Sequence, residues 1–119
     1  MKYCVHFILK NEEVLLLKRK DSNPFYPGIW TPIIGKLKSN EDPFLAVKRE
    51  TFEETQLQIN QPIFLKHCEF DKDEYWFFHS TTSESKVVLN HENDNYDFFT
   101  KDKLPENLWS FFKNTLLEI

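Results

Sequence analysis

Carboxylates gather at one place in this 119-residue chain, between positions 50 and 54. Glu53 follows Glu50 by three positions and Glu54 follows it by four, so on a helix the three side chains project toward one side. Like charges at this spacing repel one another unless they are compensated. A hard cation such as Mg²⁺ or Mn²⁺ prefers oxygen ligands and would remove the repulsion. The spacing predicts a divalent-metal site on one short helix, in which Arg49 pairs with Glu53.

The helix itself is expected from Phe44 to Thr55. Asp42 is a good N-cap, and Pro43 suits the first helical position, where no N–H is needed. Four apolar side chains can anchor the helix on a core: Phe44, Leu45, Val47 and Phe52. A solvated helix face would explain the Glu53–Glu54 pair taken alone, but it would not explain the full spacing of acidic residues.

The segment resembles the Nudix box, G-x5-E-x7-R-E-U-x-E-E-x-G-U, where U is a bulky aliphatic residue. The matching residues are Gly35, Glu41, Arg49, Glu50, Glu53, Glu54 and Leu57. Two positions differ from the family pattern. Thr51 replaces an aliphatic residue on the packed side of the helix, and Gln56 replaces a glycine that is expected to end the helix in a left-handed conformation. A residue other than glycine costs about 1 kcal/mol there, or the helix ends differently.

The stretch before the box, residues 28–36, resembles the family's G-x-W-x-x-P-G-G-K motif. Ile33 stands where proline is usual, and Ile34 stands where the first of two paired glycines is usual. These two residues predict a less open backbone beside the pyrophosphate, which affects the choice of substrate more than the chemistry.

The resemblance implies an α+β fold, the Nudix-type α/β/α sandwich with a mixed β-sheet. It also implies hydrolysis of a nucleoside diphosphate linked to another moiety, X. Glu50, Glu53 and Glu54 would be the metal ligands, with Glu50 and Glu54 in direct contact and Glu53 in contact directly or through water. Arg49 would orient the carboxylates, Glu41 would tie down the loop before the helix, and the carbonyl of Gly35 would be a further ligand.

A second acidic segment lies downstream, where Glu92 precedes Phe98 by six residues. MutT-like members of the family resemble this arrangement, and there the glutamate is a metal ligand or a candidate base. A polar loop in solvent explains the same residues. His91 and Asp94 are weaker candidates for the role of Glu92.

Asn107 is the candidate that would read a base, because an amide both donates and accepts hydrogen bonds. MutT-like enzymes have a short polar side chain at this offset from the proline, here Pro105. The alternative is that Glu106 and Asn107 cap the last helix.

Rings and cations elsewhere in the sequence are further candidates for contact with a nucleotide. Phe25, Tyr26 and Trp30 could stack on a base, although core or loop packing explains them equally well. The cations best placed to meet phosphate are Arg19, Lys20 and Lys36, each of which could also be solvated.

The remaining pattern predicts one domain over residues 1–119, with seven strands and two helices. Leu104, Leu108, Phe111, Phe112 and Leu116 have helical spacing and predict a C-terminal amphipathic helix. A loop is expected at Gly35–Glu41. The strands are expected at Lys2–Leu9, Glu13–Lys20, Ile29–Ile34, Ile63–Phe70, Tyr75–Thr81, Ser85–Leu89 and Tyr96–Thr100.

Bulk composition narrows the class of protein. A net charge of −4 argues against a general binder of nucleic-acid polymers, which would have a basic face. Cys4 and Cys68 lack any metal or redox spacing and read as free thiols. No signal segment or membrane span is apparent, so a cytoplasmic location is expected. The sequence leaves open whether the protein is a monomer or a homodimer.

These observations favour a Mg²⁺-dependent pyrophosphohydrolase of the MutT-like kind, acting on a (d)NTP or a related small nucleotide. The alternatives within the class are hydrolysis of ADP-ribose or another nucleotide sugar, of a dinucleoside polyphosphate, or of a capped RNA end. The alternative from another class is a non-catalytic module that senses nucleotides, against which the intact acidic residues argue.

Overall fold

The computed structural model describes residues 1–24 and 27–119. Seven strands and two α-helices are found in this part of the chain. The strands are β1 (Lys2–Lys10), β2 (Glu13–Arg19), β3 (Trp30–Thr31), β4 (Ile33–Lys36), β5 (Ile63–Phe70), β6 (Asp73–Thr81) and β7 (Asn93–Thr100). The helices are α1 (Pro43–Thr55) and α2 (Ser110–Leu116), and a 3₁₀ turn covers Lys101–Lys103.

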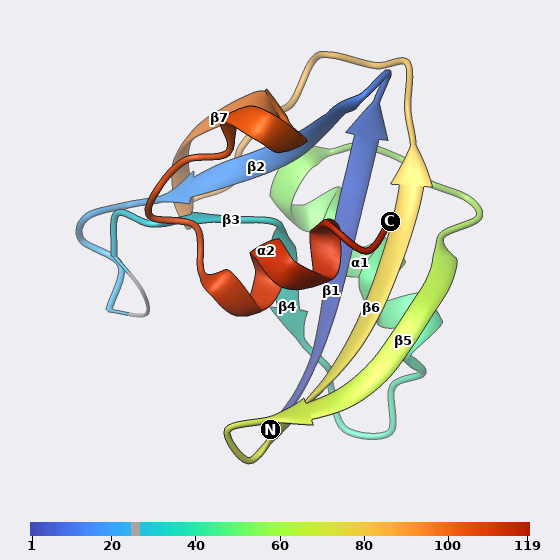
Figure 1. Cartoon of the computed structure of the whole chain (residues 1–119). Helices are drawn as coiled ribbons and strands as arrows, with labels where there is room; N and C mark the ends of the chain where they lie inside the picture. The colour runs from blue at the N-terminus through green and yellow to red at the C-terminus, as the bar shows by residue number, and fades with distance from the viewer. Residues whose placement is uncertain (25–26) are drawn as a thin grey trace.

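All seven strands form one mixed sheet whose main path is β3-β2-β1-β6-β5, while β4 pairs with β1 and β7 pairs with β2 (Figure 1). The β1–β6 pair is parallel and the other pairs are antiparallel. Strand β1 is almost continuously apolar from Val5 to Leu9, as expected for a strand that is covered on both faces.

Strand β1 is shared between two neighbours on one side. Its end at Leu9 and Lys10 pairs with β2, whereas its beginning, from Tyr3 to His6, pairs with β4. The sheet therefore forks along β1. Because β4 leads directly into the loop before α1, the fork fixes the position of the helix that carries the acidic residues.

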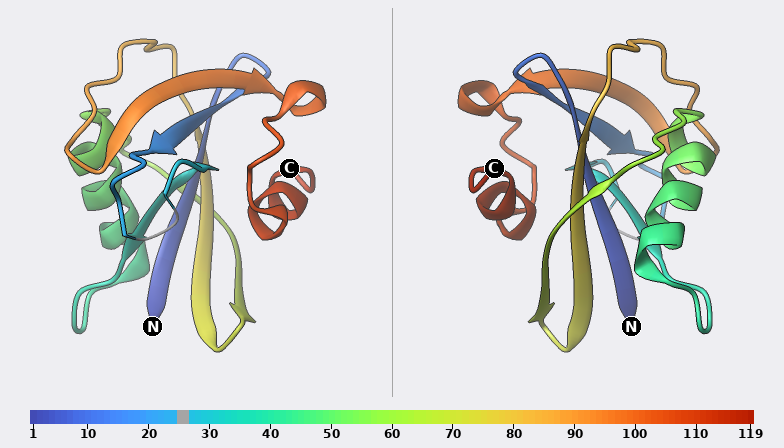
Figure 2. Two further views of the ribbon diagram at one scale, coloured as in Figure 1. Left: turned by 90° about the vertical axis from the view of Figure 1, so that its left-hand side faces the viewer. Right: turned by 90° about the vertical axis from the view of Figure 1, so that its right-hand side faces the viewer.

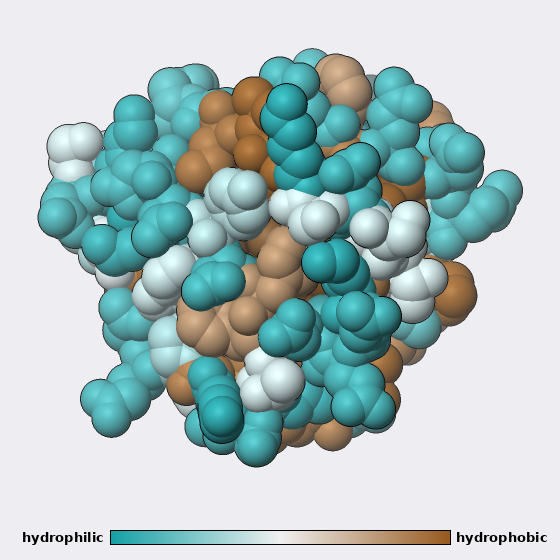
Figure 3. All heavy atoms as spheres, turned by 90° about the horizontal axis from the view of Figure 1, so that it is seen from above, coloured by the Kyte–Doolittle hydropathy of each residue, from teal (hydrophilic) through white to brown (hydrophobic). Residues whose placement is uncertain are grey.

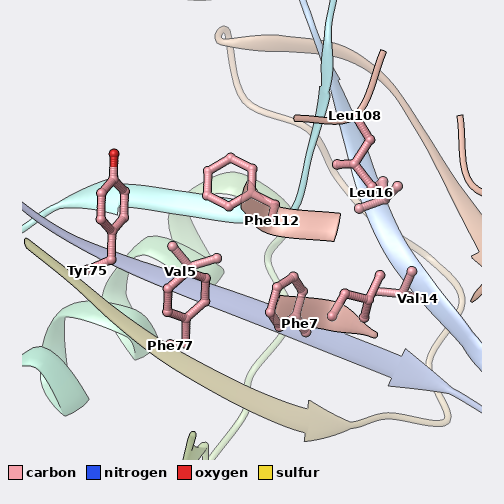
Figure 4. Close-up of a cluster of buried hydrophobic side chains, with 9 residues drawn as sticks. Val5, Phe7, Val14, Leu16, Tyr75, Phe77, Leu108 and Phe112 are labelled. Atoms are coloured by element: carbon pink, nitrogen blue, oxygen red, sulfur yellow. The ribbon is translucent and has the colours of Figure 1, made fainter. Parts of the chain in front are cut away.

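The two helices lie on opposite faces of the sheet, which gives three layers (Figure 2). The core on the α2 side is a cluster of buried apolar side chains from β1, β2, β6 and the C-terminal segment (Figure 4). On the α1 side, Ala46 and Val47 pack against Cys4 and Phe78. This architecture confirms the predicted α/β/α sandwich.

Several predicted boundaries were wrong. The expected strand Ile29–Ile34 is divided into β3 and β4 at Pro32, which has no N–H to give to a ladder, and β4 runs on to Lys36 into the expected loop. Residues Ser85–Leu89 do not form a strand. The last helix begins only at Ser110, because the apolar residues before it pack on the core without helical turns.

Helix α1 begins and ends as its sequence indicates. The carboxylate of Asp42 accepts a hydrogen bond from the N–H of Phe44 at 2.7 Å. At the other end, Gln56 adopts the left-handed conformation, with φ of 61°, and its N–H donates to the carbonyl of Phe52 at 2.8 Å. The helix therefore ends in the geometry of a glycine cap, although the residue is glutamine.

The surface agrees with the acidic, polar composition. Seen from above, the molecule is mostly hydrophilic, and apolar side chains are confined to smaller patches (Figure 3). Neither helix of the described chain has the length and the apolar run that crossing a membrane requires.

The left-handed residue provides a test of helix-end strain. We expect Gln56→Gly to raise the free energy of unfolding by about 0.5–1 kcal/mol, because glycine adopts positive φ without a clash of Cβ. The melting temperature should rise by a few degrees in a thermal unfolding experiment. Gln58→Gly is the control, since Gln58 is exposed and its φ is not positive. Equal effects of the two substitutions would show that the cap is unstrained.

Candidate active site

Helix α1 divides its carboxylates between the interior and the solvent. Glu54 is buried, with 2% of its surface exposed, because its position faces the sheet together with Thr51 and Thr55. The side chain of Glu50 is 14% exposed and that of Glu53 is 49% exposed. The three acids thus lie on one side of the helix at different depths, and Glu53 is the one that meets solvent.

Arg49 is bound by three carboxylates. Its Nε and Nη2 donate to the two oxygens of Glu41, each at 2.8 Å, and its Nη1 donates to Glu50 at 2.8 Å and to Glu53 at 3.2 Å. The hydrogen bonds from Arg49 lower the pKa of Glu41 to about 2. Glu41 also accepts the N–H of Lys38 at 2.9 Å. The expected Arg49–Glu53 pair is confirmed, and Glu41 does tie the loop to the helix.

Glu50 and Glu54 are close enough to influence each other's ionisation. Burial raises the pKa of Glu54 well above its ordinary value, and the nearby charges of Glu50 and Glu92 raise it further. Arg19 opposes this effect. Burial also raises the pKa of Glu50. One oxygen of Glu54, Oε2, is buried without a hydrogen-bond partner among the described residues.

The carboxylate of Glu50 packs directly against the backbone of Gly35. A Cβ at position 35 would overlap the side chain of Glu50, so any larger residue there would displace this carboxylate. Gly35 pairs with Cys4 across the β1–β4 ladder, and the Cys4 thiol donates to the carbonyl of Gly35 at 3.6 Å. Burial, followed by the charges of the two glutamates, raises the pKa of Cys4 to about 12, so the thiol stays protonated.

These groups fit a hard divalent cation by their chemistry. They offer carboxylate and carbonyl oxygens, which Mg²⁺ prefers. Raised pKa values at two neighbouring glutamates and the unpartnered Oε2 of Glu54 are what an uncompensated carboxylate cluster shows. In residues 1–24 and 27–119, no three His, Cys, Asp or Glu side chains converge as a ready-made metal site. Arg49 holds Glu50 and Glu53, so a cation would compete with it for these carboxylates.

A polar chain fastens α1 to the sheet at Thr51. Thr51 donates to the carbonyl of Val47 at 2.6 Å, so it accepts from Nδ1–H of His6 at 2.7 Å. Nε2 of His6 is then the acceptor for the hydroxyl of Ser80 at 2.6 Å. The exchange of an aliphatic residue for threonine is therefore matched by a buried histidine on β1 and a serine on β6.

A pocket of about 420 Å³ extends from the acidic cluster along the α2 side of the sheet. Gly35, Glu50 and Glu92 line one part of it. Aromatic rings line another part, and these are Tyr3, Tyr75, Trp109 and Phe112. Tyr3 and Tyr75 are opposite each other in the β1–β6 ladder, and their rings stack with centroids 5.4 Å apart. The pocket joins charged oxygens to a surface on which a planar ring could stack.

A second pocket of about 390 Å³ shares Arg19 and Glu92 with the first. The other residues that line it are polar or basic, with one proline: Lys20, Ser22, Asn23, Pro24 and His91. The two pockets therefore meet beside the acidic cluster, at Arg19 and Glu92.

Some of the residues predicted to bind substrate line the first pocket, and others do not. Arg19, Lys36 and Glu92 line the first pocket, as does Ile34, the residue that replaces a glycine. Trp30 packs on Phe99, with ring centroids 5.1 Å apart. Phe25 and Tyr26 lie outside the described residues.

Asn107 contacts the segment before β3, and its role in reading a base stays a prediction. Its Nδ2 donates to the carbonyl of Gly28 at 3.1 Å, and it is not among the described residues that line either pocket. The helix-capping alternative is wrong, because α2 begins at Ser110 with no side-chain cap.

Sequence reasoning did not single out the aromatic lining of the pocket. Its signal was present in the period-2 pattern, because Tyr3 leads the alternating series Val5 and Phe7 on β1, and Tyr75 leads Phe77 on β6. The parallel β1–β6 register, which brings the two tyrosines together, could not be read from the pattern.

The buried histidine predicts a pH-dependent stability. Burial, and then the charge of His79, lower the pKa of His6 from 6.5 to about 3. The unfolded chain therefore binds this proton below pH 6.5, whereas the folded protein does not bind it until the pH approaches 3, so acid favours unfolding in that window. We expect this group to remove about 2 kcal/mol of stability between pH 7.5 and pH 5, measured by urea unfolding.

His6→Leu should flatten this pH dependence, whereas His91→Gln, a change at an exposed histidine, should keep it. An unchanged slope in His6→Leu would assign the acid sensitivity to the carboxylates.

Comparison with known proteins agrees with the fold and the motif. The sequence model of the family described as NUDIX domain matches residues 2–118. Among solved structures, a MutT NUDIX hydrolase from Burkholderia pseudomallei superposes with a TM-score of 0.87 at 21% identity, covering 99% of this chain and 96% of that one.

Two other similar structures carry different activities in their names. A C. elegans Ap4A hydrolase has a TM-score of 0.75 at 23% identity, with 98% and 93% of the two chains covered. An ADP-ribose pyrophosphatase from Streptococcus suis has a TM-score of 0.73 at 17% identity, with 98% and 89% covered. Similarity at this level of identity shows a shared fold and does not select a substrate. The family match over almost the whole chain does show that this protein belongs to the Nudix family and is a hydrolase of phosphorus-containing anhydrides.

Proposed function

We propose that the protein is a Mg²⁺-dependent nucleoside triphosphate pyrophosphohydrolase of the MutT-like kind, which releases a nucleoside monophosphate and pyrophosphate. The observation that carries the proposal is the pocket of about 420 Å³, which is lined by Glu50 and Gly35 and also by the rings of Tyr3, Tyr75 and Trp109. A nucleotide has phosphates and a planar base joined by a sugar, and this pocket offers a partner to each end.

The acidic cluster would hold Mg²⁺, or Mn²⁺, through Glu50, Glu54, Glu92 and the carbonyl of Gly35, with Glu53 binding directly or through water. When bound, the cation neutralises charge on the phosphoryl oxygens and lowers the pKa of the attacking water. Without it, an anionic substrate would be repelled by the glutamates. The net charge of −4 favours a small nucleotide bound together with its cation as the substrate, and it disfavours a nucleic-acid polymer.

The chain's own residues supply positioning and proton transfer. Arg49 holds the carboxylates of Glu50 and Glu53 in fixed orientations. Arg19 and Lys36 line the pocket and are the cations that would meet the phosphates. Glu54 would act through the cation that it holds, and Glu92 is the candidate base.

The residues that line the second pocket suit a substrate whose leaving group is pyrophosphate. Arg19 and Lys20 are its cations, and its other described residues are mostly polar. This composition suits a pyrophosphate better than a second nucleoside, which would need a surface for stacking. ADP-ribose or another nucleotide sugar and dinucleoside polyphosphates are the alternative substrates. A cytoplasmic nucleotide sensor without activity is the alternative of another class, against which the complete set of acids argues.

The proposal predicts release of pyrophosphate from at least one nucleoside triphosphate, only when Mg²⁺ or Mn²⁺ is present. The test is a panel of (d)NTPs, oxidised purine nucleotides, ADP-ribose and dinucleoside polyphosphates, with and without metal. Glu54→Gln should lower kcat by about 10²–10⁴-fold while the melting temperature stays the same or rises. Glu69→Gln, on the outer strand β5, is the control that should keep full activity. Normal turnover by a folded Glu54→Gln variant would remove Glu54 from the mechanism.

A second prediction concerns the stacking surface. We expect Tyr3→Ala to raise KM for the preferred nucleotide about ten-fold with little change in kcat, because stacking on a base contributes about 1–3 kcal/mol to binding. Trp76→Ala is the matched control, since Trp76 is not among the described residues that line the pocket. Steady-state kinetics of both variants decide the point. An equal effect of the two would show that the ring of Tyr3 does not meet the base.

A further inference from the structure

Asn93, the first residue of β7, has a buried side-chain amide without a hydrogen-bond partner in the described part of the chain. Only 2% of its surface is exposed, and neither Oδ1 nor Nδ2 has a hydrogen-bond partner among the described residues. Native proteins rarely leave such groups unpaired, because burying an amide without hydrogen bonds is unfavourable. The other buried side-chain atom in this condition within the described chain is Oε2 of Glu54.

Strand register places Asn93 on the same face of the sheet as α1. Asn93 lies opposite Arg19 in the antiparallel β2–β7 pair, so the two side chains point to the same face. Arg19 follows Leu15 and Leu17 by even steps along β2, and both leucines pack in a cluster with Leu57, just after α1. Asn93 therefore belongs to the face that the C-terminal end of α1 covers.

The chain around Asn93 approaches the acidic cluster in other ways as well. The N–H of Val88, in the segment before β7, donates to the carbonyl of Thr55 at 3.0 Å, and the start of β7 lies next to the end of α1 (Figure 2). Glu92, the preceding residue, and Arg19, the residue opposite, line the same pocket as Glu50. Two neighbours of Asn93 thus lie close to a candidate metal ligand.

A bulge at this point alters the direction of the side chain. Lys18 pairs with Asn95, whereas Arg19 pairs with Asn93, so Asp94 is an extra residue on β7. Bulges of this kind re-aim side chains and are frequent beside active sites. The irregularity separates Asn93 from the regular ladder that begins at Asn95.

We propose that Asn93 is a positioning residue of this active site, which supports the candidate metal centre from behind the residues that line the pockets. The inference rests on the proposed function. Nearby carboxylates only accept hydrogen bonds and Arg19 only donates them, whereas an amide needs both kinds of partner. Oδ1 would accept from water held at the cation, and Nδ2 would donate to an oxygen of the groups that hold that water. Formation of the metal centre would therefore give the amide both kinds of partner.

The test measures binding without turnover. Asn93→Leu has a side chain of similar size and removes both polar atoms. The probe is Mn²⁺ with a nucleoside triphosphate whose α and β phosphorus atoms are joined by a methylene group, titrated by electron paramagnetic resonance and calorimetry. We expect the variant to bind this complex about ten-fold more weakly, within the range seen when groups that support a metal site are removed. The melting temperature of the ligand-free protein should stay the same or rise, because an unpaired buried amide is removed.

Asn95→Leu is the matched control, because Asn95 is exposed on the same strand and should leave binding unchanged. A lower melting temperature of Asn93→Leu with unchanged binding would overturn the inference and make Asn93 a structural residue. If Asn93→Leu does not fold, Asn93→Ala is judged by the same two measurements. Failure of the wild-type protein to bind the complex would instead contradict the proposed function, so the two failures are distinguishable.

Discussion

A helix that buries carboxylates against a sheet is the constraint on which the rest of the structure depends. Glu54 takes a position on the inner face of α1 that an apolar side chain would otherwise fill. Thr51 and Thr55 occupy two further buried positions on this face. The helix therefore has little apolar area with which to hold itself in place. Directional contacts compensate at its beginning and middle: the Asp42 cap, the Arg49 ion pairs and the hydrogen bond from His6. Each of these contacts fixes an angle as well as a distance, which is what a set of ligand oxygens requires.

The fork of the sheet along β1 places both the Gly35 backbone and the aromatic wall of the pocket. Because the first half of β1 pairs with β4 rather than with β2, the backbone at Gly35 lies against the Glu50 carboxylate on one face. On the other face, the same end of β1 presents Tyr3 beside Tyr75 of β6. A single strand thus supplies both the support for the acidic cluster and a wall of the aromatic pocket, and the distance between them is set by the rigid ladder rather than by a loop.

The sequence was most informative where local rules decide the outcome. The span of α1, its Asp42 cap and the pairing of Arg49 with Glu53 depend on neighbours a few residues apart, and all three were predicted. The break at Pro32 and the late start of α2 depend on which strand or core surface a residue meets, so patterning alone misplaced them. The same limit applies to the aromatic pocket and to the pairing of Thr51 with His6, whose members are separated by up to 109 residues in the chain. Gln56 shows the opposite case, in which the local geometry of the family was kept although the residue that favours it was lost.

The two cysteines differ in a way that has practical value. Cys4 is 1% exposed and hydrogen-bonded to Gly35, and its raised pKa leaves almost no thiolate at neutral pH. Cys68 is partly exposed on β5, the outer strand at the far end of the main sheet path. Thiol reagents should therefore modify one position and spare the other. The natural sequence already provides a single attachment point for a fluorophore or a spin label, away from the acidic cluster, with no cysteine to add or remove.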